Sequence, residues 1–97
     1  QGLRENVAFF CSTLKGLGVA ATSESAIVPL IVGDERRATR AAKLLLEQGI
    51  LVSAIRYPSV ARGSARLRAT VRADHSREDL ARAANGIARV LKGTAGE

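Results

Sequence analysis

Hydrophobic positions recur at helical spacing in three segments of the chain. In residues 3–17, apolar side chains follow one another at intervals of four and three and form one stripe, Leu3, Val7, Phe10, Leu14 and Leu17. Residues 35–48 carry a second stripe, made of Ala38, Ala41, Ala42, Leu45 and Leu46. A third stripe contains Leu80, Ala84, Ile87 and Leu91. The pattern predicts three amphipathic helices, each followed by a glycine that can end it, namely Gly18, Gly49 and Gly93.

Polar residues mark the beginnings of two of these helices. Asp34 suits the N-cap of the second helix, and Glu35 then lies favourably in its first turn. Ser76 suits the N-cap of the third helix, with Asp79 three residues later in the capping-box position. Residues 94–97 should form a frayed tail after the third helix.

Three other segments favour strands. Residues 26–33 form a continuous apolar run rich in β-branched side chains, as in a buried strand. Pro29 lies within this run. Because proline lacks a donor for the ladder, this should be an edge strand, or Pro29 should face away from its partner. Residues 50–56 form a second strand, and residues 65–73 alternate apolar and polar positions in a third.

The resulting order is α-β-α-β-β-α, in one domain of 97 residues. An adjacent pair of strands among helices predicts an α+β fold. We expect a three-stranded, mainly antiparallel sheet covered by helices on one face. The apolar fraction of 46% and charged fraction of 25% exclude disorder. No apolar run is long enough to span a bilayer, and the first residues do not form a secretory signal.

Cysteine and histidine, which often act as nucleophiles, bases or metal ligands, are scarce in this chain. Cys11 and His75 are the single residues of their kinds, so an internal disulfide or a zinc site is not expected. We expect Cys11 to be buried, His75 to form local hydrogen bonds, and the compartment to be reducing and cytoplasmic. The chain contains no methionine, which indicates a processed chain or a piece of a longer protein.

Positive charge is concentrated on the third strand. The formal net charge is +6, and a side-chain period of two places Arg66, Arg68, Thr70 and Arg72 on one face. This pattern fits either the wet face of a half-buried sheet or an anion site. A nucleic-acid-binding module is an alternative, although aromatic residues at 3% argue against a stacking platform.

Several segments, taken in order, resemble a known family. These are IVPLIVGD at residues 27–34, LEQGI at residues 46–50, AIRYPSV at residues 54–60, GSARLR at residues 63–68 and ADH at residues 73–75. Together they resemble the C-terminal domain of the α-oxoamine synthases, which are fold-type I enzymes that use pyridoxal phosphate. The AIR before the proline loop is most similar to the branch that makes 8-amino-7-oxononanoate.

The resemblance implies a homodimeric parent enzyme roughly four times longer. Its large domain, absent here, would hold the Schiff-base lysine and the other cofactor contacts, so no cofactor-binding or catalytic residue and no bound pyridoxal phosphate are expected in this chain. The parent would condense L-alanine with a pimeloyl thioester, with loss of carbon dioxide, in biotin synthesis. No nucleic acid or membrane partner is implied. Other α-oxoamine synthases, such as those resembling aminoketobutyrate ligase or serine palmitoyltransferase, remain alternatives.

Three residues match positions with roles in substrate binding in that family. Arg68 matches the arginine that grips the amino-acid carboxylate, Ser59 a substrate-contacting threonine, and Arg56 an arginine at the start of a mobile loop. The chain departs from the family pattern at four positions, Ala26, Ser59, Ala61 and Asp74. Ala61 replaces a proline, so the loop at residues 57–64 should be less rigid here.

Overall fold

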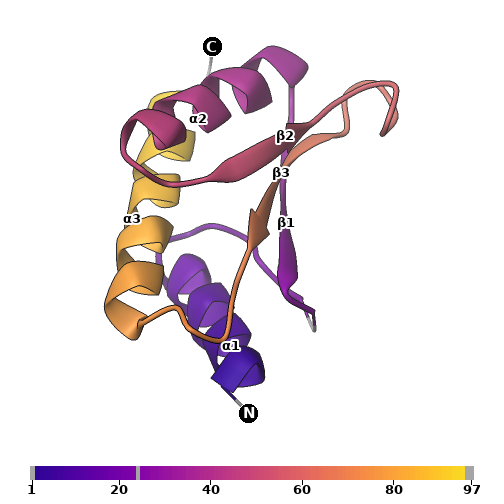
Figure 1. Ribbon diagram of the computed structural model, residues 1–97. Coiled ribbons are helices and arrows are strands. Elements are labelled where there is room, and N and C mark those ends of the chain that lie inside the picture. The colour runs from indigo at the N-terminus through magenta and orange to yellow at the C-terminus, as the bar shows by residue number, and fades with distance from the viewer. Residues whose placement is uncertain (1, 24, 96–97) are drawn as a thin grey trace.

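Six elements make up the computed structural model, which describes residues 2–23 and 25–95 (Figure 1). They follow the predicted order: α1 (Gly2–Gly16), β1 (Ile27–Gly33), α2 (Glu35–Glu47), β2 (Val52–Ile55), β3 (Ala65–Thr70) and α3 (Arg77–Gly93). Within these described residues, no helix has the length and apolar character needed to cross a membrane.

The strands form one antiparallel sheet with the order β1-β3-β2, so β3 lies in the centre. The predicted α+β architecture is confirmed. Pro29 lies on β1, which is an edge strand, as its missing donor requires. Figure 1 shows all three helices on the same side of the sheet. The other face of the sheet, here called the open face, has no helix over it.

The core lies between the helices and the covered face of the sheet. Val28, Leu30 and Leu67 point into it from β1 and β3, and all are at most 1% exposed. Helical leucines and isoleucine complete the same cluster, including Leu14, Leu45 and Ile87. Residues between these strand positions point the opposite way, which leaves Ile27 and Ile31 exposed on the open face.

Both predicted helix caps are present. The Asp34 carboxylate accepts a hydrogen bond from the Arg37 backbone N–H at 2.8 Å. The Ser76 hydroxyl accepts one from the Asp79 N–H at 3.0 Å. The predicted stripe of α3 is buried throughout.

Two strands are shorter than predicted, because backbone groups at their ends bond elsewhere. The Ile50 N–H donates to the Leu45 carbonyl at 2.8 Å, closing the end of α2, and β2 begins only at Val52. The Arg72 N–H donates to Nδ1 of His75 at 3.0 Å, so β3 ends at Thr70 and does not extend to Ala73.

Some helix positions predicted to be buried are not. Leu46 is 60% exposed because it lies one residue beyond the fully buried Leu45, outside the face of α2 that meets the sheet. Leu3 and Leu17, at the two ends of the first stripe, are 36% and 42% exposed.

Thr94 does not belong to a frayed tail. Its side chain is 1% exposed, its hydroxyl donates to the Val90 carbonyl at 2.8 Å, and Arg37 Nε donates to it at 3.3 Å. Residues 96 and 97 of the predicted tail lie outside the described residues.

Candidate functional site

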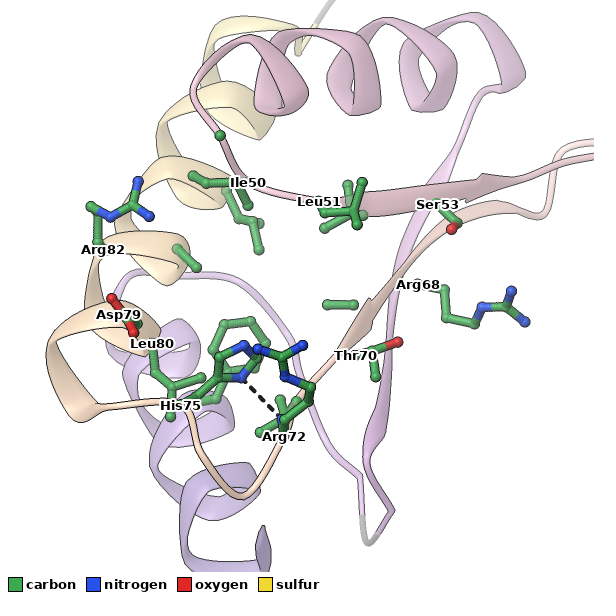
Figure 2. Close-up of a pocket in the computed structure, with 17 residues that line it drawn as sticks. Ile50, Leu51, Ser53, Arg68, Thr70, Arg72, His75, Asp79, Leu80 and Arg82 are labelled. Atoms are coloured by element: carbon green, nitrogen blue, oxygen red, sulfur yellow. Dashed lines mark hydrogen bonds between the residues drawn. The ribbon is translucent and has the colours of Figure 1, made fainter.

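Arg68 lies at the middle of the open face. It is directly opposite Pro29 on β1 and Ser53 on β2. Both neighbours are short, so they leave the Arg68 side chain exposed. Figure 2 shows its guanidinium directed away from α3 and into open space. Within the described residues no carboxylate pairs with it, so its planar donor fork can bind an anionic ligand.

Arg66 occupies a different environment on the same face. Its cross-strand neighbours are the branched residues Ile31 and Ile55. The side chain is half-buried, and its Nε donates to the Ser64 carbonyl at 3.2 Å. Part of its donor capacity is therefore already used within the chain, in contrast to Arg68.

Arg72 lies beyond the end of β3. Its Nε is 3.1 Å from the Asp74 carboxylate, and both side chains are largely exposed. An exposed ion pair of this kind contributes little to stability. It does provide Arg72 with a carboxylate partner, which Arg68 lacks among the described residues. Of the three arginines on the predicted basic face, Arg68 is thus the best placed for a ligand.

The loop between β2 and β3 carries the other two candidate residues. Arg56 and Ser59 are both exposed, and the Ser59 N–H donates to the Arg56 carbonyl at 2.9 Å in a turn. The Tyr57 N–H donates to the Glu35 carboxylate at 3.3 Å, which attaches the loop to the beginning of α2. The Arg62 guanidinium lies 4.0 Å from the centre of the Tyr57 ring, in a cation–π contact.

Arg68 lies in the sheet, apart from Arg56 and Ser59, which share the turn after β2. Arg56 is three residues along from Ser53, the partner of Arg68, and therefore about 10 Å from Arg68 along the strand direction. No hydrogen bond or ion pair joins Arg68 to Arg56 or Ser59 among the described residues. A ligand could bridge this separation, because all three side chains are exposed.

A concavity of about 540 Å³ lies where β2 and β3 diverge. Its walls come from residues 49–53, the end of β3 and the first half of α3. His75, Asp79 and Arg82 contribute polar groups to it (Figure 2). The sequence analysis missed this feature because it predicted that β2 begins at residue 50. His75 forms a local hydrogen bond, as expected, but with the Arg72 N–H, and this early end of β3 was not predicted from the sequence.

Pyridoxal phosphate forms a Schiff base with a lysine of its enzyme. The three lysines, Lys15, Lys43 and Lys92, are all exposed on helices, where none can form a shielded covalent link to a cofactor. The described residues also contain no cluster of ligands for a metal ion. Cys11 is buried, as expected, and burial raises the pKa of its thiol. Arg68 is therefore suited to an anionic ligand, whereas the exposed lysines are not suited to a shielded covalent link with a cofactor.

Comparison with protein families gives the class of the chain. The family model described as "Aminotransferase class I and II" matches residues 1–87. The chain belongs to this family.

Individual relatives show which members of the family the chain is similar to. A putative 8-amino-7-oxononanoate synthase from Desulfovibrio desulfuricans is 45% identical over 91 residues, covering 94% of this chain and 24% of that protein. The 8-amino-7-oxononanoate synthase from Bacillus pumilus is 43% identical over 84 residues, covering 86% of this chain and 21% of that protein. The chain thus spans about a quarter of the length of these curated relatives.

Solved structures of two enzymes share the fold. A serine palmitoyltransferase from Sphingomonas wittichii superposes with a TM-score of 0.87 and 27% identity, over 96% of this chain and 24% of that one. An 8-amino-7-oxononanoate synthase from Francisella tularensis gives 0.79 at 24% identity, over 95% of this chain and 27% of that one. The architecture is therefore that of a domain found in both enzymes.

Proposed function

We propose that this chain is the small C-terminal domain of a pyridoxal-phosphate-dependent acyltransferase. The whole protein would be an 8-amino-7-oxononanoate synthase, which joins L-alanine to a pimeloyl thioester with loss of carbon dioxide in biotin synthesis. Relatives of that name, 36–47% identical to this chain, support the proposal. The cofactor would be held by residues outside this chain, in a cytoplasmic homodimer.

The observation that carries the proposal is the environment of Arg68. It is exposed on the open face, lies between two short side chains and has no carboxylate partner within the described residues. An arginine in this state is suited to a carboxylate, which it can bind through two parallel hydrogen bonds. Its role would be to hold the carboxylate of the amino acid and so orient the substrate for reaction.

Ser59 and Arg56 would act on the other substrate. Among the hydrogen bonds of the described residues 57–63, only the one donated by the Tyr57 N–H connects the loop to α2. The other hydrogen bonds lie within the loop. Such a loop can change its conformation when a long acyl thioester arrives. The Ser59 hydroxyl and the Arg56 guanidinium would then contact the thioester substrate from the loop side.

Assay of the full-length protein tests the proposal. Purified protein loaded with pyridoxal phosphate is mixed with L-alanine and a pimeloyl thioester, and the condensation product and released carbon dioxide are measured. The proposal predicts both products in equal amounts. Absence of both products, from folded and loaded protein, would refute the proposed reaction.

A related acyltransferase is the second candidate. The Sphingomonas wittichii serine palmitoyltransferase has the same fold over nearly the whole chain, and its 27% identity is lower than that of the synthase relatives. The same assay, repeated with serine and a palmitoyl thioester, separates the two. Faster turnover of that pair than of L-alanine and the pimeloyl thioester would favour the second candidate.

A further inference from the structure

A cluster of hydrogen bonds connects the beginning of α1 to the end of β3. The Asn6 side-chain amide donates to the carbonyl of Arg72 at 2.9 Å, of His75 at 3.0 Å and of Ala73 at 3.3 Å. Nδ1 of His75 accepts a hydrogen bond from the Arg72 N–H at 3.0 Å (Figure 2). The turn after β3 is therefore held by Asn6 from α1 and by His75 from within the turn itself. We call these two side chains, with their hydrogen bonds, the β3 clamp.

The end of β3 depends on this clamp because it is not supported on its β2 side. The last β2–β3 pair is Val52 with Ala69, and beyond it the strands diverge around the concavity. On the β1 side, the Val71 N–H donates to the Ala26 carbonyl at 2.8 Å. The next residue, Arg72, is instead held through the clamp.

The clamp fixes the strand that carries Arg68. Arg68 lies four residues before Arg72, about 13 Å along an extended strand. Arg68 is paired with both neighbouring strands, one residue before the last β2–β3 pair, so a twist of the unpaired end of β3 would reach it through Ala69 and change the direction of its guanidinium. Bidentate binding of a carboxylate is sensitive to such a change, because its two bonds must lie in one plane.

We infer that Asn6 and His75 are positioning residues, which hold the end of β3 against α1 and thereby set the orientation of Arg68 toward its ligand. This inference rests on the proposed function, since the ligand is the carboxylate of the amino-acid substrate. In this inference both residues act through the backbone of residues 72–75, where their hydrogen bonds lie.

The test measures the dissociation constant of L-alanine for the full-length, cofactor-loaded protein by calorimetry, with kinetics alongside. Asn6→Ala removes the donor, His75→Phe keeps a ring but removes the acceptor, and His75→Asn keeps an acceptor on a shorter side chain. We expect each of the first two variants to weaken L-alanine binding about three- to tenfold, because the clamp acts on Arg68 only indirectly and the loss should not exceed that of about one hydrogen bond. His75→Asn should recover at least part of this loss. The KM of the thioester should stay unchanged.

A double-mutant cycle with Arg68→Ala separates positioning from general stabilisation. If the clamp acts through Arg68, then Asn6→Ala should cause no further loss of L-alanine binding in the Arg68→Ala background. Three results would overturn the inference. The first is that Asn6→Ala weakens L-alanine binding equally with and without Arg68→Ala, and the second is that Asn6→Ala and His75→Phe leave binding unchanged. The third result is a rise in the KM of the thioester that matches the loss of L-alanine binding. If Asn6→Ala does not fold, the His75→Phe and His75→Asn pair gives the same comparison.

The same cycle distinguishes failure of this inference from failure of the proposed function. If Arg68→Ala weakens L-alanine binding but the clamp variants do not, only the positioning role is wrong. If Arg68→Ala itself leaves L-alanine binding unchanged in folded protein, the proposed role of Arg68 is wrong and the positioning role is wrong with it.

Discussion

Pro29 lies directly across from Arg68 in the register of β1 and β3, and this pairing explains why Arg68 is exposed. The proline ring is short, and Ser53 on the other side is short as well. Arg66, two residues earlier, lies instead between Ile31 and Ile55 and is half-buried. Two arginines on one face of one strand thus differ in how far their side chains are exposed to a ligand, because their cross-strand neighbours differ in size.

Ser53→Ile should reproduce at Arg68 the crowding that isoleucine causes at Arg66. We expect the KM of L-alanine in the full-length enzyme to rise about three- to tenfold, because part of the guanidinium's access is lost. Ser53→Ala, which keeps the side chain short, is the matched control and should stay within about twofold of the parent. Equal values for the two variants would show that the cross-strand neighbour does not control access to Arg68.

The 97-residue chain should fold on its own. All three strands are paired, and helices cover one face of the sheet around a single buried cluster. We expect a cooperative urea transition of the purified chain, followed by circular dichroism. A gradual loss of signal without a transition would mean that the domain depends on contacts outside this chain.

Adjacent leucines of α2 should differ sharply in their contribution to stability. Leu45 is 0% exposed and Leu46 is 60% exposed. Leu45→Ala should lower the free energy of unfolding by about 2–5 kcal/mol, because it leaves a cavity. Leu46→Ala should change it by less than about 0.5 kcal/mol. The comparison is made by urea unfolding of both variants, and similar losses would contradict the face of α2 that the structure places in the core.

Cys11 should react slowly with alkylating reagents in the folded chain. Burial raises the pKa of its thiol, against smaller opposing effects of a hydrogen bond from the Ser23 backbone and of the Lys15 charge. Less thiolate is therefore present at a given pH than for an exposed cysteine, and the rate should increase as the pH is raised. Iodoacetamide labelling, followed by mass spectrometry with and without urea, measures this. Equal rates in the two conditions would contradict burial of Cys11.

The sequence was sufficient to predict the element order, the two helix caps and the buried stripe of α3. These features depend on neighbours within a few residues, such as Ser76 and Asp79. The missing donor of Pro29 allowed two arrangements, and the structure has one of them, with β1 at the edge of the sheet.

The strand ends and the choice among the arginines depend on more than the alternation of apolar and polar residues. Periodicity placed Arg66 and Arg68 on one face, but only the register with β1 and β2 shows which of them has short neighbours. Likewise, β3 ends early because the His75 side chain bonds the Arg72 N–H while Asn6, 66 residues away from Arg72, holds its carbonyl. Periodicity does not show the His75 bond, although it spans only three residues, and the Asn6 bond joins residues far apart in the sequence.

Binding of L-alanine to the Arg68→Ala variant of the full-length, cofactor-loaded protein tests the central claim most directly. The lost contact is a charge-assisted, bidentate hydrogen bond, so the dissociation constant should rise about ten- to a hundredfold. Arg68→Lys should recover only part of this loss because a point charge lacks the planar fork. Arg66→Ala and Arg72→Ala are the controls from the same face. A large loss confined to Arg68→Ala is the predicted result, whereas equal losses in all three variants, or none in a folded Arg68→Ala protein, would contradict the account.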